Sequence, residues 1–157
     1  MEILEFYTLS PAEQARWTQA IRRGDDWRAS AYLADRLERG ILRERNGPAA
    51  EVLLLTEGRE LLAYCTLSDN DEIDAPELTP WIGFVYTFPA HRGHRYSGVL
   101  IRRACELARA QGFDAVYLSS HEAGLYEKYG FAPLRRMPTI WGDETQVFRR
   151  GLDDIEI

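Results

Sequence analysis

The middle of the chain constrains the fold most, because a strand, a basic turn and a helix follow one another there without a break. Residues 81–88 form an apolar run of strand length, and helical periodicity continues from residue 98 to residue 111. The first N–H groups of a helix have no partner inside the helix, and the helix dipole makes that end positive. The segment therefore predicts an anion-binding cradle, and Arg92 and Arg95 in the turn favour a ligand that bears phosphate.

Charge is unevenly distributed along the chain. The 157 residues carry a formal net charge of −6, which argues against a nucleic-acid partner because such proteins are usually basic. Five acidic residues lie between positions 69 and 77, and none follows from 78 to 105, where four arginines lie. We expect an anionic ligand on the basic side and a cationic co-substrate on the acidic side. A solvated loop beside a solvated helix face is the alternative.

Several classes of protein are not expected. No run of about 18 apolar residues occurs, so we predict no membrane span or membrane partner. Residues 1–5 lack the basic and apolar regions of a secretory signal. Cys65 lies in a strand-like run and Cys105 in a helix-like run, and neither has the spacing of a metal site. We expect two reduced, packed cysteines in a cytoplasmic protein without metal.

Hydrophobic periodicity and turn signals indicate a mixed α/β (α+β) fold in a single domain of residues 1–157. Ser10, Pro11 and Glu13 give the clearest helix start, with Ser as N-cap and Pro at the first helical position. In chain order, we expect a strand at 3–9, helices at 10–23 and 28–39, strands at 51–56, 61–67 and 81–88, a helix at 98–111, a strand at 115–118, a short helix at 123–129, and strands at 131–136 and 145–149. This order predicts a mostly antiparallel central sheet with flanking helices and one parallel pair around the central helix.

Two common classes of phosphate-bearing ligand can be excluded from the sequence of the turn. Residues 93–98 have the form G-x-x-x-x-G, but Val99 and Leu100 stand where a nucleotide-binding P-loop needs Lys and then Ser or Thr. The dinucleotide pattern G-x-G-x-x-G is also absent. Coenzyme A is the remaining common ligand of a strand–turn–helix diphosphate cradle.

Two blocks of sequence then carry a family resemblance. Arg92, Arg95 and Ser97 follow a Thr-Phe-Pro segment at 87–89, and residues 124–131 read GLYEKYGF. The first block resembles the Q/R-x-x-G-x-G/A motif that follows V-x-P in the GNAT superfamily of N-acetyltransferases, and the other block is similar to the LYEKxGF segment of that family. The resemblance covers residues 50–150, which it implies are the cofactor-binding core. Residues 1–45 would supply the acceptor-side strand and helices.

The resemblance implies acetyl-CoA as co-substrate and a particular set of residues that hold it. In the family, the strand before the turn splays from its parallel neighbour, and backbone groups near its end bind the pantetheine and provide the oxyanion donor. The implied cofactor-binding residues are Val85, Tyr86, Thr87, Arg92, Gly93, His94, Arg95, Tyr96, Ser97, Gly98 and Ser119. Two of them depart from the family pattern, because Arg95 replaces a glycine and Ser119 replaces a frequent asparagine. We interpret Arg95 as an added cation for the diphosphate.

The resemblance also implies catalytic roles. Tyr126 is the expected general acid, since a phenol can protonate a departing thiolate. Glu77 is the expected base, because the family often places a glutamate near the start of the third strand of the meander. Asp74, Glu72 and His121 are alternatives to Glu77. Direct transfer in a ternary complex is expected, because neither cysteine is placed to form an acyl-enzyme.

The acceptor remains open at this point. We expect a primary amine of a small molecule or a peptide, and a non-catalytic acyl-CoA-sensing module is the alternative function. Homodimers are common in the family, so a homodimer is a further alternative. Among the tryptophans, Trp27 and Trp81 are the better candidates to line an acceptor cleft.

Overall fold

Seven strands form one mixed sheet in the computed structural model of the chain, which describes residues 1–155. Their order across the sheet is β1-β2-β3-β4-β5-β7-β6. Every neighbouring pair is antiparallel except β4 and β5, which are parallel. The strands are β1 (Glu2–Glu5), β2 (Glu51–Glu57), β3 (Glu60–Ser68), β4 (Trp81–Thr87), β5 (Ala115–Ser120), β6 (Ala132–Pro138) and β7 (Glu144–Gly151).

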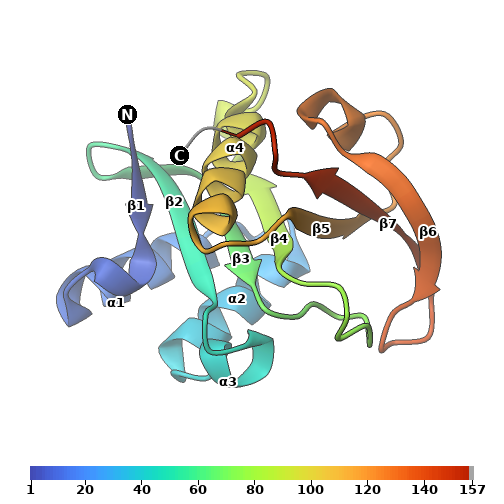
Figure 1. Cartoon of the computed structure of the whole chain (residues 1–157). Helices are drawn as coiled ribbons and strands as arrows, with labels where there is room; N and C mark the ends of the chain where they lie inside the picture. The colour runs from blue at the N-terminus through green and yellow to red at the C-terminus, as the bar shows by residue number, and fades with distance from the viewer. Residues whose placement is uncertain (156–157) are drawn as a thin grey trace.

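Helices cover both faces of this sheet. The α-helices are α1 (Pro11–Arg22), α2 (Arg28–Glu38), α3 (Leu42–Asn46) and α4 (Tyr96–Ala110), and the short 3-10 helices are η1 (Phe6–Thr8), η2 (Pro89–His91) and η3 (Tyr126–Tyr129). Helix α4 lies across one face, and α1 and α2 lie on the other (Figure 1). Within residues 1–155, no helix combines the length and the hydropathy that a membrane crossing needs.

Strand β2 shows why the sequence places a helix on each face. Successive side chains of a strand point to opposite faces, and here both sets are apolar. Leu53 and Leu55 pack in the hydrophobic cluster that contains Leu100 of α4. Val52 and Leu54 pack in the separate cluster beneath α1 and α2. A strand that is buried on both sides requires two helical layers.

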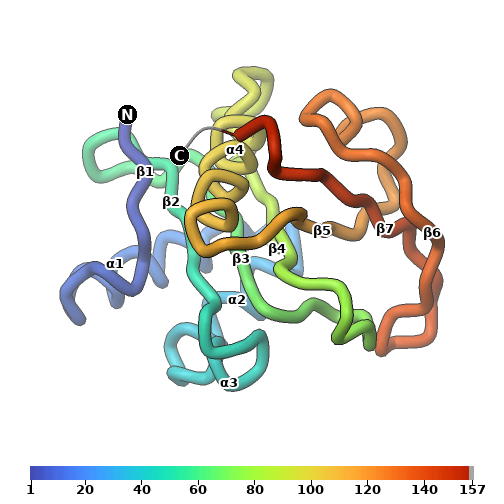
Figure 2. Tube along the Cα trace, in the orientation of Figure 1, coloured from blue at the N-terminus to red at the C-terminus, as the bar shows by residue number. Residues whose placement is uncertain are grey.

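The parallel pair opens a gap in the sheet. Strands β4 and β5 are paired only at Trp81 and Tyr117, where the Tyr117 N–H donates to the Pro80 carbonyl at 3.0 Å. Beyond this point the two strands diverge, as the trace shows (Figure 2). The other edge of β5 pairs with β7 along its whole length. The backbone edges of β4 and β5 that face each other are therefore available to a ligand.

The acidic loop between β3 and β4 is anchored by its apolar residues. Ile73, Ala75 and Leu78 are buried together with Trp81 and Val147 in a third cluster. The Trp81 indole donates to the Leu78 carbonyl at 2.7 Å. Because these apolar residues fix the loop, they determine which of its carboxylates face the sheet and which face solvent.

The predicted fold class is confirmed, including a parallel pair within a mostly antiparallel sheet. The predicted start of α1 is confirmed in detail, because the Ser10 hydroxyl accepts from the Glu13 N–H at 3.2 Å and Pro11 is the first helical residue. Three expectations were wrong. The short helix expected at 123–129 is the four-residue 3-10 helix η3. The first strand is shorter than predicted, since the chain turns into η1 at Phe6. Helix α3 was not predicted.

Candidate active site

A cleft of about 820 Å³ lies where β4 and β5 diverge. Its walls come from β4, the turn that leads to α4, the end of β5, η3 and the loop between α1 and α2. Tyr126 and all the sequence-predicted cofactor residues except His94 and Gly98 line it. The structure therefore brings together two blocks that lie far apart in the sequence.

Strand β4 has a bulge at the level of the cleft. Tyr64 pairs with Tyr86 and Thr66 with Gly83, so Phe84 and Val85 both lie opposite the single residue Cys65 of β3. Phe84 adopts a left-handed conformation with φ of 48°. Such a bulge leaves one residue outside the ladder and turns its backbone groups away from the neighbouring strand. This places unpaired backbone groups on the cleft side of β4.

The turn before α4 presents backbone N–H groups at one end of the cleft. Gly93 and Arg95 have positive φ, at 90° and 59°, and this bends the chain into the helix. The first bonds of the helix are donated by Gly98 and Val99 to the Arg95 carbonyl, so the N–H groups that precede them point out of the helix end. The first turn of α4 contains no acidic residue. This end of the cleft is suited to an anion.

Arg95 adopts a backbone conformation that glycine adopts more easily than other residues. A left-handed backbone costs a side-chain-bearing residue free energy that glycine does not lose. The Arg95 side chain is exposed and lines the cleft. Arg95 therefore lowers the stability of the fold through its backbone conformation, and it adds a positive charge to the cleft.

Arg95→Gly separates these two effects. We expect the free energy of unfolding to stay within about 1 kcal/mol, because relief of the left-handed strain offsets the greater freedom of the unfolded glycine. Affinity for coenzyme A should fall about tenfold at low salt through the loss of the cation, and by less at high salt. Calorimetric titration at two salt concentrations measures this. Arg103→Gln, which removes a charge elsewhere on α4, is the control, and an equal loss in both variants would contradict a local role for Arg95.

Tyr126 lies in η3 with its side chain buried against the sheet. Its ring packs on Phe131, at 6.3 Å between centroids, and on Phe148, at 6.1 Å. Burial, with a smaller contribution from the charge of Glu122, raises the pKa of Tyr126 to about 12. The phenol thus stays protonated across the physiological range, as a proton donor must.

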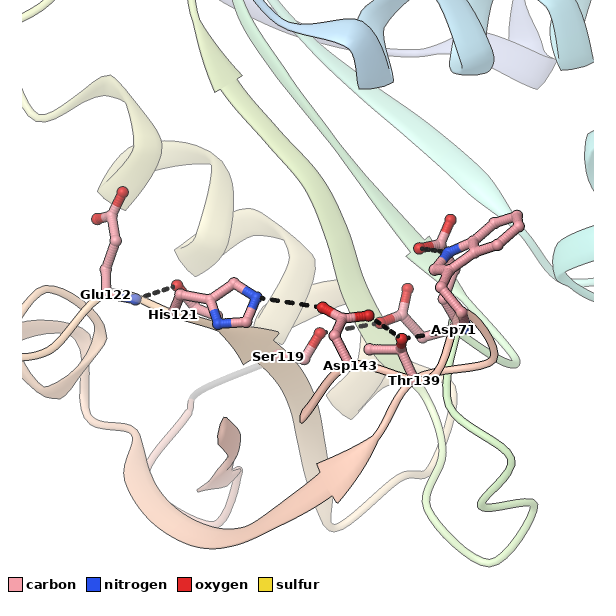
Figure 3. Close-up of polar contacts among 9 residues, drawn as sticks. Asp71, Ser119, His121, Glu122, Thr139 and Asp143 are labelled. Atoms are coloured by element: carbon pink, nitrogen blue, oxygen red, sulfur yellow. Dashed lines mark hydrogen bonds and ion pairs between the residues drawn. The ribbon is translucent and has the colours of Figure 1, made fainter. Parts of the chain in front are cut away.

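Asp71 lies at the point where β4 and β5 separate. The Ser119 hydroxyl donates to Asp71 Oδ2 at 3.3 Å (Figure 3). A Cβ built on Gly83 would lie 3.5 Å from Asp71 Oδ1, so the carboxyl sits over β4 as well. Both Gly83 and Ser119 line the cleft. Burial, with the charge of Glu72, raises the pKa of Asp71 to about 6, so the carboxylate can accept a proton near neutral pH.

The structure does not bring the predicted base, Glu77, to the cleft. Its carboxylate is exposed and lies 3.5 Å from Arg135 of β6. The physical reason is the anchoring of the loop, because burial of the adjacent Leu78 turns the Glu77 side chain toward solvent. Sequence reasoning did not single out Asp71, since nothing local distinguishes it from the other four acidic residues of the loop.

The three residues predicted as alternatives to Glu77 lie in different places relative to the cleft. Asp74 is exposed on the loop. The Glu72 carboxylate accepts from the Trp141 indole at 3.0 Å, in the hairpin between β6 and β7. His121 lines the cleft, and its Nε2 lies 3.8 Å from Asp143 Oδ2 of the same hairpin (Figure 3). His121 is therefore the only one of these three that reaches the cleft within residues 1–155.

The two tryptophans expected to line an acceptor cleft lie in different places. Trp27, in the loop between α1 and α2, lines the cleft and stacks on Tyr86 with centroids 5.6 Å apart and planes at 3°. Trp81 is 1% exposed and belongs to the third hydrophobic cluster. Its position at the single β4–β5 pairing makes it a structural residue.

A second cavity of about 510 Å³ adjoins the turn on the other side of Ser97 and Tyr129. Its lining includes Arg95, Arg102 and Lys128. Gly98 belongs to this cavity and packs closely against η3, since a Cβ there would lie 2.6 Å from the Tyr129 ring. Gly98 thus allows close approach of α4 and η3.

Gly98→Ala tests this packing role. The added methyl must displace the Tyr129 ring, so the free energy of unfolding should fall by about 1 to 3 kcal/mol. Urea denaturation measures it. Val99→Ala, at the exposed neighbouring position, should change stability by less than about 0.5 kcal/mol. Equal stability of the Gly98→Ala variant and the parent would show that the close approach is not required.

Comparison with known proteins assigns the chain to a family. The model of the acetyltransferase (GNAT) family matches residues 12–131. The chain belongs to the GNAT acetyltransferase family.

Individual relatives agree with this assignment. The chain is 29% identical over 125 residues to a mycothiol acetyltransferase from Streptomyces scabiei, a match that covers 76% of the chain. The match spans only 35% of that relative's length. The fold is similar to that of a protein from Desulfovibrio desulfuricans assigned to the GNAT family, with a TM-score of 0.73, 12% identity and coverage of 96% of this chain and 98% of the other. It is also similar to an aminoglycoside 6′-N-acetyltransferase complexed with coenzyme A, with a TM-score of 0.69, 13% identity and full coverage of both chains.

Proposed function

We propose that this protein is an acetyl-CoA-dependent N-acetyltransferase that moves an acetyl group to a primary amine of a small molecule or peptide. The observation that carries the proposal is the cleft between β4 and β5, which has a turn suited to an anion at one end, Tyr126 in its wall and Asp71 hydrogen-bonded to the lining residue Ser119. Residues 50–150 would hold acetyl-CoA. Residues 1–45, within the same single domain, would face the acceptor, since Asp26 and Trp27 line the cleft.

Binding follows from the backbone. The N–H groups of the turn at 93–97 would hold the diphosphate, supported by the helix dipole and by Arg95. The pantetheine arm would lie between the diverging strands along Val85, Tyr86 and Thr87, with Ser119 on the opposite wall. A backbone N–H of the β4 bulge would stabilise the oxyanion.

The chemistry needs one proton acceptor and one proton donor. The amine nitrogen attacks the thioester carbonyl carbon, and its surplus proton passes to the Asp71 carboxylate. The C–S bond breaks as the carbonyl re-forms, and the departing thiolate takes the Tyr126 hydroxyl proton. Transfer is direct, because both cysteines are buried and burial raises their pKa values, to about 11 for Cys105.

A thiol-release screen tests this function. Acetyl-CoA is incubated with polyamines, amino acids, aminoglycosides and peptides with free N-termini, and acetyl-CoA binding is measured separately by calorimetry. We expect a one-to-one binding isotherm and amine-dependent thiol release with at least one class. Binding without release across the panel would instead support an acyl-CoA-sensing module. The absence of binding heat would contradict both.

A further inference from the structure

Arg92 occupies the first position of the cofactor motif, yet its guanidinium is bound to the acceptor side of the cleft. Its Nη2 lies 3.0 Å from Asp26 Oδ2, and its Nε donates to the Thr87 carbonyl at 3.0 Å. The guanidinium carbon also lies 5.7 Å from the centroid of the Tyr86 ring. One side chain thus links the diphosphate turn to the loop between α1 and α2.

Asp26 has a second partner that does not depend on Arg92. The Tyr86 hydroxyl donates to Asp26 Oδ1, and Trp27 stacks on the same Tyr86 ring. The hydrogen bond from Tyr86 is the main cause that lowers the pKa of Asp26, with Arg92 contributing less. The carboxylate therefore stays ionised and oriented when the guanidinium leaves. It lies beside two aromatic rings, an arrangement that suits a cationic group.

The ion pair between Arg92 and Asp26 can be replaced by a stronger ion pair at little cost in stability. Both side chains are about half exposed, at 52% and 42%, and exposed ion pairs contribute little to stability. A bidentate guanidinium–phosphate contact is among the stronger hydrogen-bonded pairs. A diphosphate bound at the adjacent turn would therefore compete successfully for Arg92.

We propose that Arg92 moves from Asp26 to the diphosphate when acetyl-CoA binds, and that the released Asp26 binds a cationic group of the acceptor other than the reacting amine. This inference rests on the proposed function and extends it. Acetyl-CoA binding then creates the acceptor site, so the cofactor binds first. The acceptor class is an amine with a second positive charge.

The first test is the affinity for coenzyme A, measured by calorimetry at 0.15 M salt. Asp26→Asn should bind coenzyme A roughly two- to fivefold more tightly than the parent, because no ion pair has to be broken. Asp25→Asn removes the same charge from the neighbouring exposed position and should bind as the parent does. In an Arg92→Gln background, Asp26→Asn should give no gain.

These variants separate the exchange from a general charge effect. An unchanged or weaker affinity in Asp26→Asn would overturn the exchange, and so would an equal gain in the Arg92→Gln background. Failure of the parent itself to bind coenzyme A would instead contradict the proposed function.

The second test concerns the acceptor and uses 1,4-diaminobutane as the probe, with butylamine as its singly charged control. We expect 1,4-diaminobutane to bind the coenzyme A complex about fivefold more tightly than the free protein. Asp26→Asn should remove this difference, and butylamine should not show it. If 1,4-diaminobutane binds the complex no more tightly than the free protein, the acceptor role of Asp26 is wrong.

Discussion

Replacement of Tyr126 by phenylalanine is expected to lower kcat by about 100-fold while the Kd for acetyl-CoA changes by less than about twofold. The hydroxyl is the only group removed, and the ring keeps its packing on Phe131 and Phe148. Because burial holds the pKa of Tyr126 at about 12, the hydroxyl is protonated whenever the thiolate departs. The loss should therefore appear in the chemical step and leave binding intact.

Tyr129→Phe provides the matched control for this variant. Tyr129 belongs to the same 3-10 helix, but its hydroxyl lies 3.4 Å from Ser97 Oγ and its ring faces the second cavity. Steady-state kinetics of both variants, with calorimetric titration of acetyl-CoA, distinguish the two tyrosines. An unaffected kcat in Tyr126→Phe, or an equal loss in both variants, would remove Tyr126 from the role of general acid.

Asp71→Asn is expected to lower kcat/KM for an amine by about 100-fold or more at pH 8. Asparagine is nearly isosteric and retains a partner for the Ser119 hydroxyl, but it cannot accept the amine proton. In the parent, activity should fall as the pH decreases through about 6, because protonation of Asp71 removes the base. This decline should be absent from the residual activity of the variant.

The Asp71 contribution to stability should change with pH in the opposite direction to activity. The pKa of Asp71 is higher in the folded protein than in the unfolded chain, so its ionisation destabilises the fold as the pH rises from the unfolded value to about 6. Asp71→Asn should therefore melt at the same temperature as the parent or higher at pH 8. A lower Tm with unchanged kcat would show that Asp71 is a structural residue and contradict its role as base.

Glu77→Gln tests the base that was predicted from sequence. The Glu77 carboxylate is exposed and paired with Arg135, so we expect kcat/KM to change by less than about twofold. A loss as large as that of Asp71→Asn would restore the base predicted from sequence.

Much of the fold could be predicted because local signals agreed with the tertiary structure. The Ser10-Pro11 start gave α1, and the apolar run of residues 51–56 gave β2, which is buried on both faces. Helix α3 was missed because residues 42–46 span little more than one turn and the helix has no side-chain N-cap. The first strand was predicted too long, since Phe6 is apolar but packs into the core from a 3-10 turn.

The residues of the candidate site also differ in whether local sequence reveals them. The turn before α4 and the segment that contains Tyr126 could be recognised from sequence, because each is a contiguous stretch, and the structure places both in the wall of the cleft. Asp71 could not be singled out, since its position depends on a hydrogen bond from Ser119 and on the space left by Gly83, which belong to two other strands. The partner of Arg92 was equally hidden, because Asp26 lies in a loop that precedes it by 66 residues.

A structure determined with bound acetyl-CoA tests the central claim most directly. We predict that the diphosphate is held by the N–H groups of residues 93–97 and that the thioester lies between β4 and β5, with its sulfur near the Tyr126 hydroxyl. A diphosphate bound elsewhere, or a turn whose amides point away from it, would contradict this claim.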